Sequence, residues 1–553
     1  MKTLPQTPHS PVQWLAWSVL AMALMLPLSG GARPVDLAKR ILLAPVPQEL
    51  AYSPGTTPLP GHISVFGLDA LRPGDAATVE TMANLFTAIG VRGDFGGDAS
   101  YCVRFERDPS VAHREGYRLV SDSSGITVRA STDAGAFYGA QTVYQVLAYA
   151  RHGEEFLHYA DFPAEGWGRF LVPHLTIQDH PAYKVRAFMA DLGRAPYSMA
   201  LLKRLVRLMA QMKLNTLHLH LFDDQLCGFR FEKLPIGHEN PFSLNAADLK
   251  ELVAYARRYH ISVMPELESW GHVASLVYHF PQLRGGEGAY GGASFGMGEA
   301  TYAFLEKLYD EIVPCLESEA AVHVGLDEAI WAVLPGEEAR GHTPTNMVGR
   351  IHEILMRVAA RHGKRITMHL WADHGGRALP PALETRVVIE PWRYLGADEA
   401  GIVETLKKYG GAGKTPLMMG TGANSYAFSG NYEGTRIWCL QGLAYPNVEG
   451  VTLCMWESND LAGRLVTLYG GACFAWKPDA QVRARNDTTG EKLRQMIDRQ
   501  MRSWQIVFPD ADQAAINEDR GPEVKTGRYV WPPYAGKAVA PTVDFGKPKG
   551  GAQ

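Results

Sequence analysis

The sequence predicts a (β/α)8 barrel of the α/β class, preceded by a small α+β domain. Three observations support this prediction. The 553 residues exceed a single domain of about 150 residues. Before residue 164 short strand patterns alternate with helical ones, whereas from residue 184 a strand-like run, a loop and a helical pattern repeat. Eight such runs are present, and eight parallel strands with crossover helices close into a barrel.

The composition is that of an ordinary globular chain. Hydrophobic residues make up 46% and charged residues 20%, which excludes disorder, collagen and coiled coil for the whole chain. Lys plus Arg total 54 against 58 for Asp plus Glu, so the formal net charge is -4. This balance provides no basic field for nucleic acid and no polybasic attraction to a membrane. We therefore expect neither partner.

The first 32 residues have the pattern of an export signal. Lys2 supplies a positive start, the run from Trp14 to Leu28 is apolar apart from Ser18, and small residues precede a cut expected before Arg33. The alternative is an uncleaved anchor, but the run is shorter than the ~20 residues that span a bilayer. We expect a signal peptide over residues 1–32 and a mature protein that is periplasmic or secreted. The 6 Cys are too sparse for a disulfide scaffold.

The N-terminal α+β domain is expected over residues 33–175. Its clearest feature is a pair of strand patterns within residues 116–130, joined by a turn at residues 122–125. A helix with one apolar face follows from about Asp133 to Ala150. The barrel is expected over residues 176–488. Residues 489–553 are expected to hold one helix and a loosely ordered tail rich in Gly, Pro and Lys.

The barrel strands are expected in chain order at residues 187–192, 216–221, 262–266, 322–325, 366–371, 387–391, 417–420 and 451–456. The clearest helices between them are expected at residues 199–212, 246–259, 302–317 and 345–362. Catalytic side chains of such barrels lie at the carboxyl ends of the strands. Here those ends carry many carboxylates, histidines and tryptophans.

Two adjacent carboxylates, Asp327 and Glu328, follow the fourth strand. Because strand side chains alternate, His323, Gly325 and Asp327 should point into the barrel. Neighbouring carboxylates should raise one pKa, as a proton donor near neutral pH requires. An Asp-Glu pair is also common as a helix cap, but a strand end that faces several tryptophans favours a catalytic pair.

Residues 323–328, HVGLDE, resemble the H-x-G-G-D-E signature of glycoside hydrolase family 20, the exo-β-N-acetylhexosaminidases. Three more segments resemble that family in matching order: residues 185–194 (VRAFMADLGR), 213–225 (KLNTLHLHLFDDQ) and 265–272 (PELESWGH). Residues 116–142 resemble its non-catalytic N-terminal domain. The similarity runs from about residue 41 to residue 475.

The resemblance implies removal of terminal β-linked N-acetylhexosamine (GlcNAc or GalNAc) from glycans, without a cofactor or a metal. The implied mechanism is retaining and substrate-assisted: the acetamido oxygen attacks C1 and an oxazolinium ion forms. Glu328 would be the general acid/base, and Asp327 would hold the acetamido N–H. The implied substrate-binding residues are Arg186 for sugar hydroxyls, His220, Asp224 (or Asp223), Glu268, His272, Trp371, Trp392, Tyr426, Trp456 and Glu457.

Several positions depart from the family pattern. Leu326 stands in place of the second glycine, Glu268 in place of an aspartate and Trp270 in place of a proline. Trp456 and Glu457 lack the residue that separates them in the family. Near the seventh strand a Tyr and an Asp are expected, but only Tyr426 is found. The choice between GlcNAc and GalNAc therefore stays open.

Two other functions are compatible with a barrel. His218 and His220 would place two imidazoles on one inner face, as in metal-dependent amidohydrolases. Against this, the late strands end in Trp and Glu rather than in further His and Asp ligands. The second is a barrel that binds sugar without hydrolysing it. Retention of both Asp327 and Glu328 argues against that function.

Overall fold

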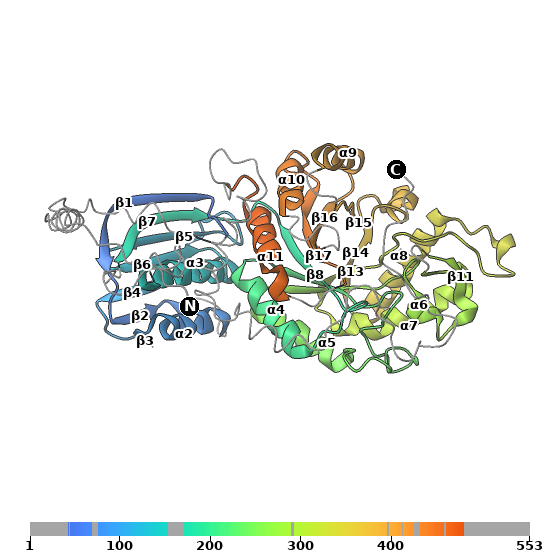
Figure 1. The fold of residues 1–553 in the computed structure, drawn as a ribbon, viewed down its shortest axis with the longest axis horizontal. Helices are drawn as coiled ribbons and strands as arrows, with labels where there is room; N and C mark the ends of the chain where they lie inside the picture. The colour runs from blue at the N-terminus through green and yellow to red at the C-terminus, as the bar shows by residue number, and fades with distance from the viewer. Residues whose placement is uncertain are drawn as a thin grey trace, which may run out of the picture. The chain divides into compact units, whose positions relative to one another are not determined.

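The computed structural model describes residues 43, 45–68, 76–152, 171–288, 292–394, 398–411, 413–424, 432–457 and 461–480. The expected signal peptide, the C-terminal helix and tail, and Tyr426 lie outside the described residues. Within the described residues, no helix combines the length and apolar character needed to cross a membrane. Figure 1 shows the sheet of the N-terminal domain, with α2 and α3, and the barrel with its helices.

The N-terminal domain is built on a seven-stranded sheet in the order β1-β7-β5-β6-β4-β2-β3. Its elements are β1 (Glu49–Pro58), β2 (His62–Phe66), α2 (Ala76–Ile89), β3 (Arg92–Phe95), β4 (Tyr101–Arg107), β5 (Tyr117–Asp122), β6 (Gly125–Ala130), α3 (Asp133–His152) and β7 (Leu171–Asp179). β5 and β6 form the predicted antiparallel hairpin, and α3 is the predicted helix. β7 pairs with β1 and β5, so this sheet continues past the boundary expected at residue 175.

The predicted barrel is present and closed. Eight parallel strands form it in the order β10-β13-β14-β15-β16-β17-β8-β9. They are β8 (Val185–Asp191), β9 (Thr216–His220), β10 (Ser262–Glu266), β13 (Glu319–His323), β14 (Arg365–Trp371), β15 (Val387–Glu390), β16 (Leu417–Asn424) and β17 (Val448–Met455). Each overlaps a predicted strand, because strands buried on both faces are read as continuous apolar runs.

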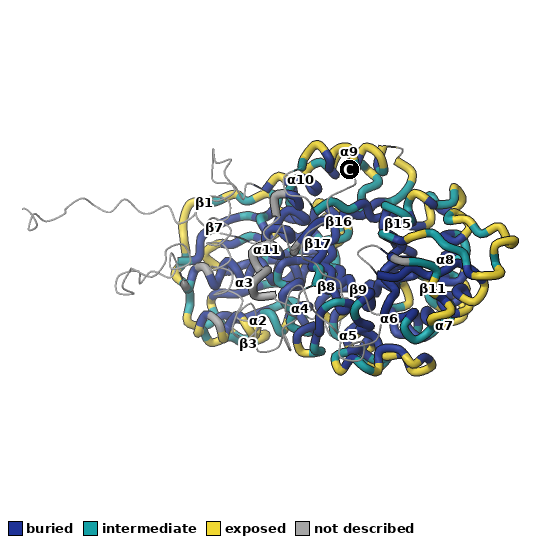
Figure 2. The backbone as a smooth tube through the Cα atoms, turned by 45° about the vertical axis from the view of Figure 1, so that its right-hand side comes forward, coloured by how far each residue is buried: buried dark blue, intermediate teal, exposed yellow. Residues whose placement is uncertain are grey.

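Helices surround the barrel, and local capping explains where several of them begin. They are α4 (Met199–Gln211), α5 (Ala246–Arg258), α6 (Ala274–Val277), α7 (Glu299–Ile312), α8 (Pro344–Arg361), α9 (Glu399–Gly410), α10 (Tyr432–Gly442) and α11 (Leu461–Trp476). Ser198 caps α4, and Asn245 and Thr343 form capping boxes at α5 and α8. A two-stranded hairpin of β11 (Arg284–Glu287) and β12 (Ala293–Phe295) lies between α6 and α7 in the chain. In Figure 2 the barrel strands β8, β9, β16 and β17 are largely buried, whereas exposed residues lie on the outer helices and loops and on β1.

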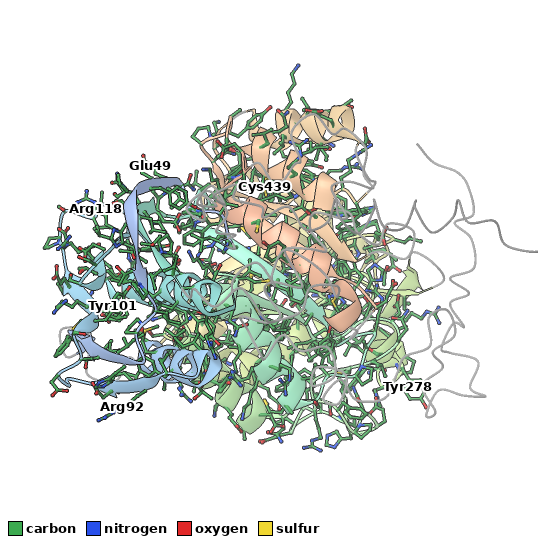
Figure 3. The ribbon with its side chains drawn as sticks, turned by 60° about the vertical axis from the view of Figure 1, so that its left-hand side comes forward. Glu49, Arg92, Tyr101, Arg118, Tyr278 and Cys439 are labelled. Carbon is green, nitrogen blue, oxygen red and sulfur yellow. The ribbon has the colours of Figure 1, made fainter. Side chains whose placement is uncertain are left out.

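All six cysteines lie among the described residues as buried free thiols. Cys439 of α10, which is labelled in Figure 3, is fully buried. Cys454 of β17 is likewise buried and unpaired. The described residues therefore hold together without a disulfide.

Arg186, expected to bind sugar hydroxyls, lies near the amino end of β8 and is fully buried. Its Nη1 donates to Glu115 Oε2 at 2.8 Å, and its Nε donates to the Lys213 carbonyl oxygen at 2.8 Å. About five strand residues, or roughly 16 Å, separate it from Asp191 at the carboxyl end. The expectation for Arg186 is therefore wrong, and this residue joins the barrel to the N-terminal domain.

Candidate active site

A tight turn after β13 brings Asp327 and Glu328 to the carboxyl end of the barrel. Gly325, Leu326 and Glu328 have φ angles of 68°, 74° and 43°, in the left-handed region that favours glycine. Leu326 is fully buried, and its carbonyl oxygen accepts a hydrogen bond from the Gly375 N–H at 3.0 Å. Packing thus holds a strained backbone between the strand and the two carboxylates.

His272 links these two carboxylates to the polar groups behind them. Its Nε2 lies 3.3 Å from Glu328 Oε2 and 3.7 Å from Asp327 Oδ2. Its Nδ1 lies 3.2 Å from Asp224 Oδ2 and 3.4 Å from Asp223 Oδ1. Burial lowers the pKa of His272, but Asp223 and Asp327 outweigh it and raise the pKa well above its usual value. We infer an imidazolium that donates from both ring nitrogens.

Asp224 is oriented by backbone amides. Its Oδ1 accepts hydrogen bonds from the Ala274 N–H at 2.9 Å and the Ala293 N–H at 3.0 Å. A Cβ at Gly292 would meet Asp224 Oδ2 at 1.9 Å, so glycine is needed beside this carboxylate. These contacts fix the oxygen that His272 approaches. Asp224, which the resemblance implied as a substrate-binding residue, is therefore a buried support of His272.

Arg194, just after β8, is a cation at the site that the sequence analysis quoted but did not assign. Its Nη2 lies 2.6 Å from Asp223 Oδ2, and its Nη1 lies 3.2 Å from Asp191 Oδ2. Burial opposes its charge, but Asp223 and Asp191 raise its pKa well above the usual value. Its guanidinium carbon lies 5.2 Å from the Trp456 ring centroid. Its position past the end of a strand is the signal that distinguishes it from Arg186.

His220 lies behind the site and is 1% exposed. Its Nδ1 is 2.6 Å from Glu266 Oε2, and its Nε2 is 2.9 Å from Asp223 Oδ2. Burial lowers its pKa, but Glu266 and Asp223 reverse this effect and raise the pKa to about 10. With both ring nitrogens occupied, His220 supports Asp223 instead of reaching a substrate as expected.

The pKa of the Asp327 carboxyl group is raised. It is 9% exposed, and burial is the main cause that raises its pKa to about 7. His272 opposes this shift, whereas Asp373 and Glu328 add to it. The raised pKa expected for one member of the pair therefore falls on Asp327.

Glu268 is buried next to Gly325. A Cβ at Gly325 would meet Glu268 Oε2 at 1.9 Å, so the first glycine of the signature makes room for this longer acid. Burial raises the pKa of Glu268 well above its usual value, and Asp327 and Glu266 add to the shift. Across the part of the chain that the structure describes, neither carboxyl oxygen of Glu268 has a hydrogen-bond partner. We infer a neutral acid that underlies the site without contacting substrate.

The three tryptophans expected around the sugar lie close together. Trp371 is 1% exposed, and its Nε1 donates to Glu266 Oε1 at 2.6 Å. Its ring centroid is 6.0 Å from that of Trp456. Trp392 stacks on Tyr394 with centroids 5.3 Å apart. Trp392 and Trp456 are half-buried, so they are accessible to a ligand, whereas Trp371 lies beneath them.

Glu457 follows β17 and faces the cation of the site. It has a φ of 60°, and its N–H donates to Asp191 Oδ2 at 2.8 Å. Burial raises its pKa to about 8, with Arg194 opposing and Asp191 adding to the shift. The structure therefore brings Glu457 together with Arg194 and Trp456, just past the carboxyl ends of β17 and β8.

Asp373 is a second residue of the site that the sequence analysis did not assign. Its Oδ2 accepts hydrogen bonds from the Glu328 N–H at 3.0 Å and from His374 Nδ1 at 2.9 Å. Its Oδ1 accepts one from Trp392 Nε1 at 3.4 Å. Asp373 thus fixes the backbone of Glu328, and its place after the fifth strand was the available signal.

The histidine pair considered for an amidohydrolase centre is arranged differently. Side chains that could hold a metal ion group in threes around Glu266, Asp223 and His272. A metal ligand must offer a free lone pair, whereas both ring nitrogens of His220 and of His272 face carboxylate oxygens. His218 stacks against Trp371 with centroids 6.1 Å apart, and its Nε2 is 3.0 Å from Glu266 Oε2. These groups therefore form an ion-paired layer behind the carboxylates.

Two models of one family match this chain, one over the N-terminal domain and one over much of the barrel. The family model "Glycosyl hydrolase family 20, domain 2" matches residues 41–180, and "Glycosyl hydrolase family 20, catalytic domain" matches residues 183–404. The carboxylate pair, His272 and Arg194 fall within the second match. Trp456 and Glu457 lie beyond it.

Two relatives illustrate the similarity in sequence. The chain is 29% identical over 236 residues to a beta-hexosaminidase of Porphyromonas gingivalis, across 39% of this chain and 29% of that protein. It is 28% identical over 254 residues to a beta-N-acetylhexosaminidase of Cellulomonas fimi, across 42% of this chain and 48% of that protein. The chain thus spans less than half the length of these curated relatives.

Solved structures share the fold. A chitobiase of Flavobacterium johnsoniae matches with a TM-score of 0.64 at 19% identity, covering 86% of this chain and 74% of that one. A beta-N-acetylhexosaminidase of Streptomyces coelicolor matches with a TM-score of 0.61 at 21% identity, covering 86% and 97%. At this identity the matches establish the fold alone.

Proposed function

Because the chain belongs to glycoside hydrolase family 20, we propose that it removes terminal β-linked N-acetylhexosamine from glycans with retention of configuration. The observation that carries this proposal is the pair Asp327 and Glu328 at the end of β13, with His272 Nε2 3.3 Å from Glu328 Oε2. In this family the substrate's own acetamido group is the nucleophile. A second carboxylate is then needed to support that group, not to attack C1.

Glu328 is the general acid of the first step. It gives its proton to the glycosidic oxygen while the bond from that oxygen to C1 breaks. The acetamido oxygen forms a new bond to C1, so the products are an alcohol and an oxazolinium ion. Asp373 holds the Glu328 N–H at 3.0 Å, and His272 lies beside the Glu328 carboxyl group. These contacts keep the proton donor at a defined place.

Asp327 supports the acetamido group. In its ionised form it accepts the amide N–H and balances the positive charge of the oxazolinium ion. Its raised pKa of about 7 means that Asp327 is partly protonated near neutral pH in the absence of substrate. An amide N–H bound to Asp327 favours the ionised form of that residue. Substrate binding therefore lowers the pKa of Asp327 toward the ionised form that the first step needs.

Water completes the reaction. Glu328, now ionised, takes a proton from a water molecule as the water oxygen attacks C1 and the bond to the acetamido oxygen breaks. Two displacements at C1 restore the original configuration. The acetamido group is regenerated, and Glu328 is protonated again for the next turnover.

Arg194 takes the role that the sequence analysis gave to Arg186. Its guanidinium is held by two aspartates and lies over Trp456, so its remaining donor capacity is directed at the site. Glu457 is its neighbour on the next strand. We place the hydroxyl groups of the terminal sugar against Arg194 and Glu457, and the sugar ring against Trp456 and Trp392.

The test is hydrolysis of matched aryl β-glycosides of GlcNAc, GalNAc and glucose by the purified full chain. Turnover is expected only where the 2-acetamido group is present, because that group is the nucleophile. Equal hydrolysis of the plain glucoside would contradict substrate assistance. Binding of the two acetamido sugars without turnover would favour the sugar-binding barrel instead.

We also propose that residues 1–32 direct export. The support is their pattern of one early Lys, an apolar run and small residues. Expression in a host with an export pathway, followed by N-terminal sequencing of the exported protein, should give Arg33 as the first residue. A chain retained at full length inside the cell would contradict this proposal.

A further inference from the structure

Leu326 is a large apolar residue in a turn whose backbone conformation favours glycine. Its φ is 74°, a left-handed value that is uncommon for a residue with a Cβ, yet its side chain is fully buried. It lies between β13 and Glu328 in the chain, so its conformation decides the direction in which Glu328 leaves the strand. Because a strained backbone persists only where its surroundings over-determine it, the contacts of Leu326 bear on the placement of the proton donor.

Gly375, in the loop after β14, lies against Leu326 with no room for a side chain. A Cβ at Gly375 would be 2.7 Å from Leu326 Cβ and 3.1 Å from Leu326 Cδ1, whereas ordinary van der Waals contact begins at 3.4 Å. The backbone of Gly375 is right-handed helical, with φ -61° and ψ -45°, a region open to residues with a Cβ. Space for Leu326, and not freedom of the backbone, is therefore what requires glycine here.

Two hydrogen bonds that run in opposite directions join this loop to the turn after β13. The Gly375 N–H donates to the Leu326 carbonyl oxygen at 3.0 Å. The Glu328 N–H donates to Asp373 Oδ2 at 3.0 Å. The two backbones approach closely enough for both bonds because Gly375 presents no Cβ to Leu326. The fit between Leu326 and Gly375 thus determines how near Asp373 lies to the Glu328 N–H.

We propose that Leu326 and Gly375 form a matched positioning pair, which seats the loop after β14 so that Asp373 holds Glu328 in the orientation for proton transfer. This inference rests on the proposed function. Both residues of the pair are buried, so they act through Asp373 and do not contact the substrate. The leucine that departs from the family signature is therefore accommodated by a glycine in the neighbouring loop, and a larger residue at position 375 moves the proton donor.

The first variant is Gly375→Ala in the full chain, with the β-linked disaccharide of GlcNAc as the substrate. The new methyl group must displace the loop or the turn, and a misplacement of about 1 Å can cost on the order of 100-fold in rate. We expect kcat to fall roughly 10- to 100-fold and KM to change by less than about threefold, because Arg194 and Trp456 follow other strands. The loss should be smaller on an aryl N-acetylglucosaminide, whose leaving group needs little protonation.

Removal of the Leu326 side chain should restore the fit. Leu326→Gly takes away two of the three nearest atoms, and the third, Leu370 Cδ1 at 3.0 Å, is the end of a flexible side chain. In that background Gly375→Ala should lower kcat by less than about threefold, whereas Leu326→Ala keeps the Cβ at 2.7 Å and should not rescue. Gly376→Ala is the matched control in the same loop, because the atom nearest to its Cβ, Ala372 Cβ, is 3.3 Å away. It should change kcat by less than about twofold.

The pH profile of kcat/KM separates positioning from a general loss of packing. His272 lowers the pKa of Asp327, whereas burial and three carboxylates, Asp373, Glu328 and Glu266, raise it. Ionised Asp327 is the active form, so activity is lost as the pH falls through its pKa. Displacement of Asp373 in the single variant weakens one of the raising influences, so the acid limb should shift to lower pH. The double variant should return the acid limb to its wild-type place.

Equal losses from Gly375→Ala with and without the Leu326 side chain, or no loss at all, overturn the proposal. So does an equal loss on the two substrates with an acid limb that stays in place. Thermal unfolding reports whether each variant is folded. If Gly375→Ala does not fold while the double variant folds and is active, the match between Leu326 and Gly375 is supported. If neither folds, the methyl group meets another part of the protein and the proposal fails. A wild-type protein that hydrolyses no acetamido glycoside would contradict the proposed function itself.

Discussion

Asp373 Oδ2 accepts a hydrogen bond from the Glu328 N–H at 3.0 Å. A carboxylate that follows β14 therefore fixes the backbone of Glu328, the neighbour of Asp327. The same carboxylate is one of the charges that raise the pKa of Asp327 to about 7. Asp373 therefore positions one member of the pair and disfavours ionisation of the other. We therefore expect a change at Asp373 to alter the pH dependence of activity.

Asp373→Asn should shift the acid limb of the kcat/KM profile to lower pH. Ionised Asp327 is the active form, so activity is present above its pKa and is lost as the pH falls through about 7. Removing the Asp373 charge lowers that pKa, while the Asn carbonyl oxygen still accepts the Glu328 N–H. The measurement is kcat/KM from pH 4 to pH 9 on an aryl N-acetylglucosaminide. An acid limb that stays in place or moves to higher pH would show that Asp327 is not the group observed.

A second prediction separates the two arginines. Arg194→Gln should lower kcat/KM by roughly 10- to 100-fold, the effect of lost charged hydrogen bonds to substrate. Arg186→Met should instead lower the free energy of unfolding by roughly 1–3 kcal/mol, because the half-buried Glu115 loses its cation and the Lys213 carbonyl oxygen loses a donor. Its kcat/KM per folded molecule should be close to that of the wild type.

Activity at a temperature well below Tm, together with denaturant unfolding of both variants, checks this pair. Arg194→Gln also leaves Asp223 and Asp191 without their cation, so its unfolding curve is the necessary control. Loss of turnover in folded Arg186→Met protein would show that Arg186 takes part in catalysis or substrate binding.

The fold was predictable because buried parallel strands are continuous apolar runs, and helices between them repeat. The sequence alone did not show how far each side chain lies from the carboxyl end of its strand. Arg186 and Arg194 lie in one motif, yet only the strand register places the first at the amino end and the second at the carboxyl end. His220 and Glu268 belong to the right strand ends, but their burial behind Asp223 and Gly325 depends on neighbours from other strands.

Two other features could not be predicted from the sequence: a strained backbone that packing stabilises, and contacts between side chains from separate segments. Leu326 in place of glycine looks incompatible with a left-handed backbone, yet its burial and its bond to Gly375 hold the φ of 74°. The rings of Trp331 and His374 both contact that of Trp270, but the three residues come from separate segments. No local sequence pattern therefore predicts these contacts. Tyr426, the residue expected near the seventh strand, remains a prediction.

Trp456→Ala should weaken binding of substrate and of a thiazoline mimic of the intermediate together. Trp456 is half-buried and adjoins Trp371 and Arg194, so its ring offers apolar contact to the sugar. The expected loss is ~1–3 kcal/mol for each ligand. Calorimetry with the mimic and KM for the aryl glycoside measure it. If both affinities are unchanged, Trp456 packs only against protein, and the sugar lies elsewhere.

The last prediction tests the division of labour between the paired carboxylates. Glu328→Gln removes the proton donor, which typically contributes ~100–10,000-fold. Its loss should be smaller for an activated aryl leaving group, which needs little protonation, than for a sugar. Asp327→Asn keeps the shape but removes the charge that holds the acetamido N–H and balances the oxazolinium ion. Formation of that ion should therefore suffer alike for every leaving group.

The measurement is kcat/KM for both variants across aryl leaving groups of graded pKa. The β-linked disaccharide of GlcNAc serves as the substrate whose leaving group is not activated. Glu328 has its side chain 23% exposed beside His272, while Asp327 is nearly buried, so the outer residue is the one placed to meet a glycosidic oxygen. Glu328→Gln should steepen the dependence on leaving-group pKa, and Asp327→Asn should not. The opposite result would mean that the two roles are exchanged, with the inner carboxyl group, whose pKa of about 7 suits a proton donor, acting as the acid.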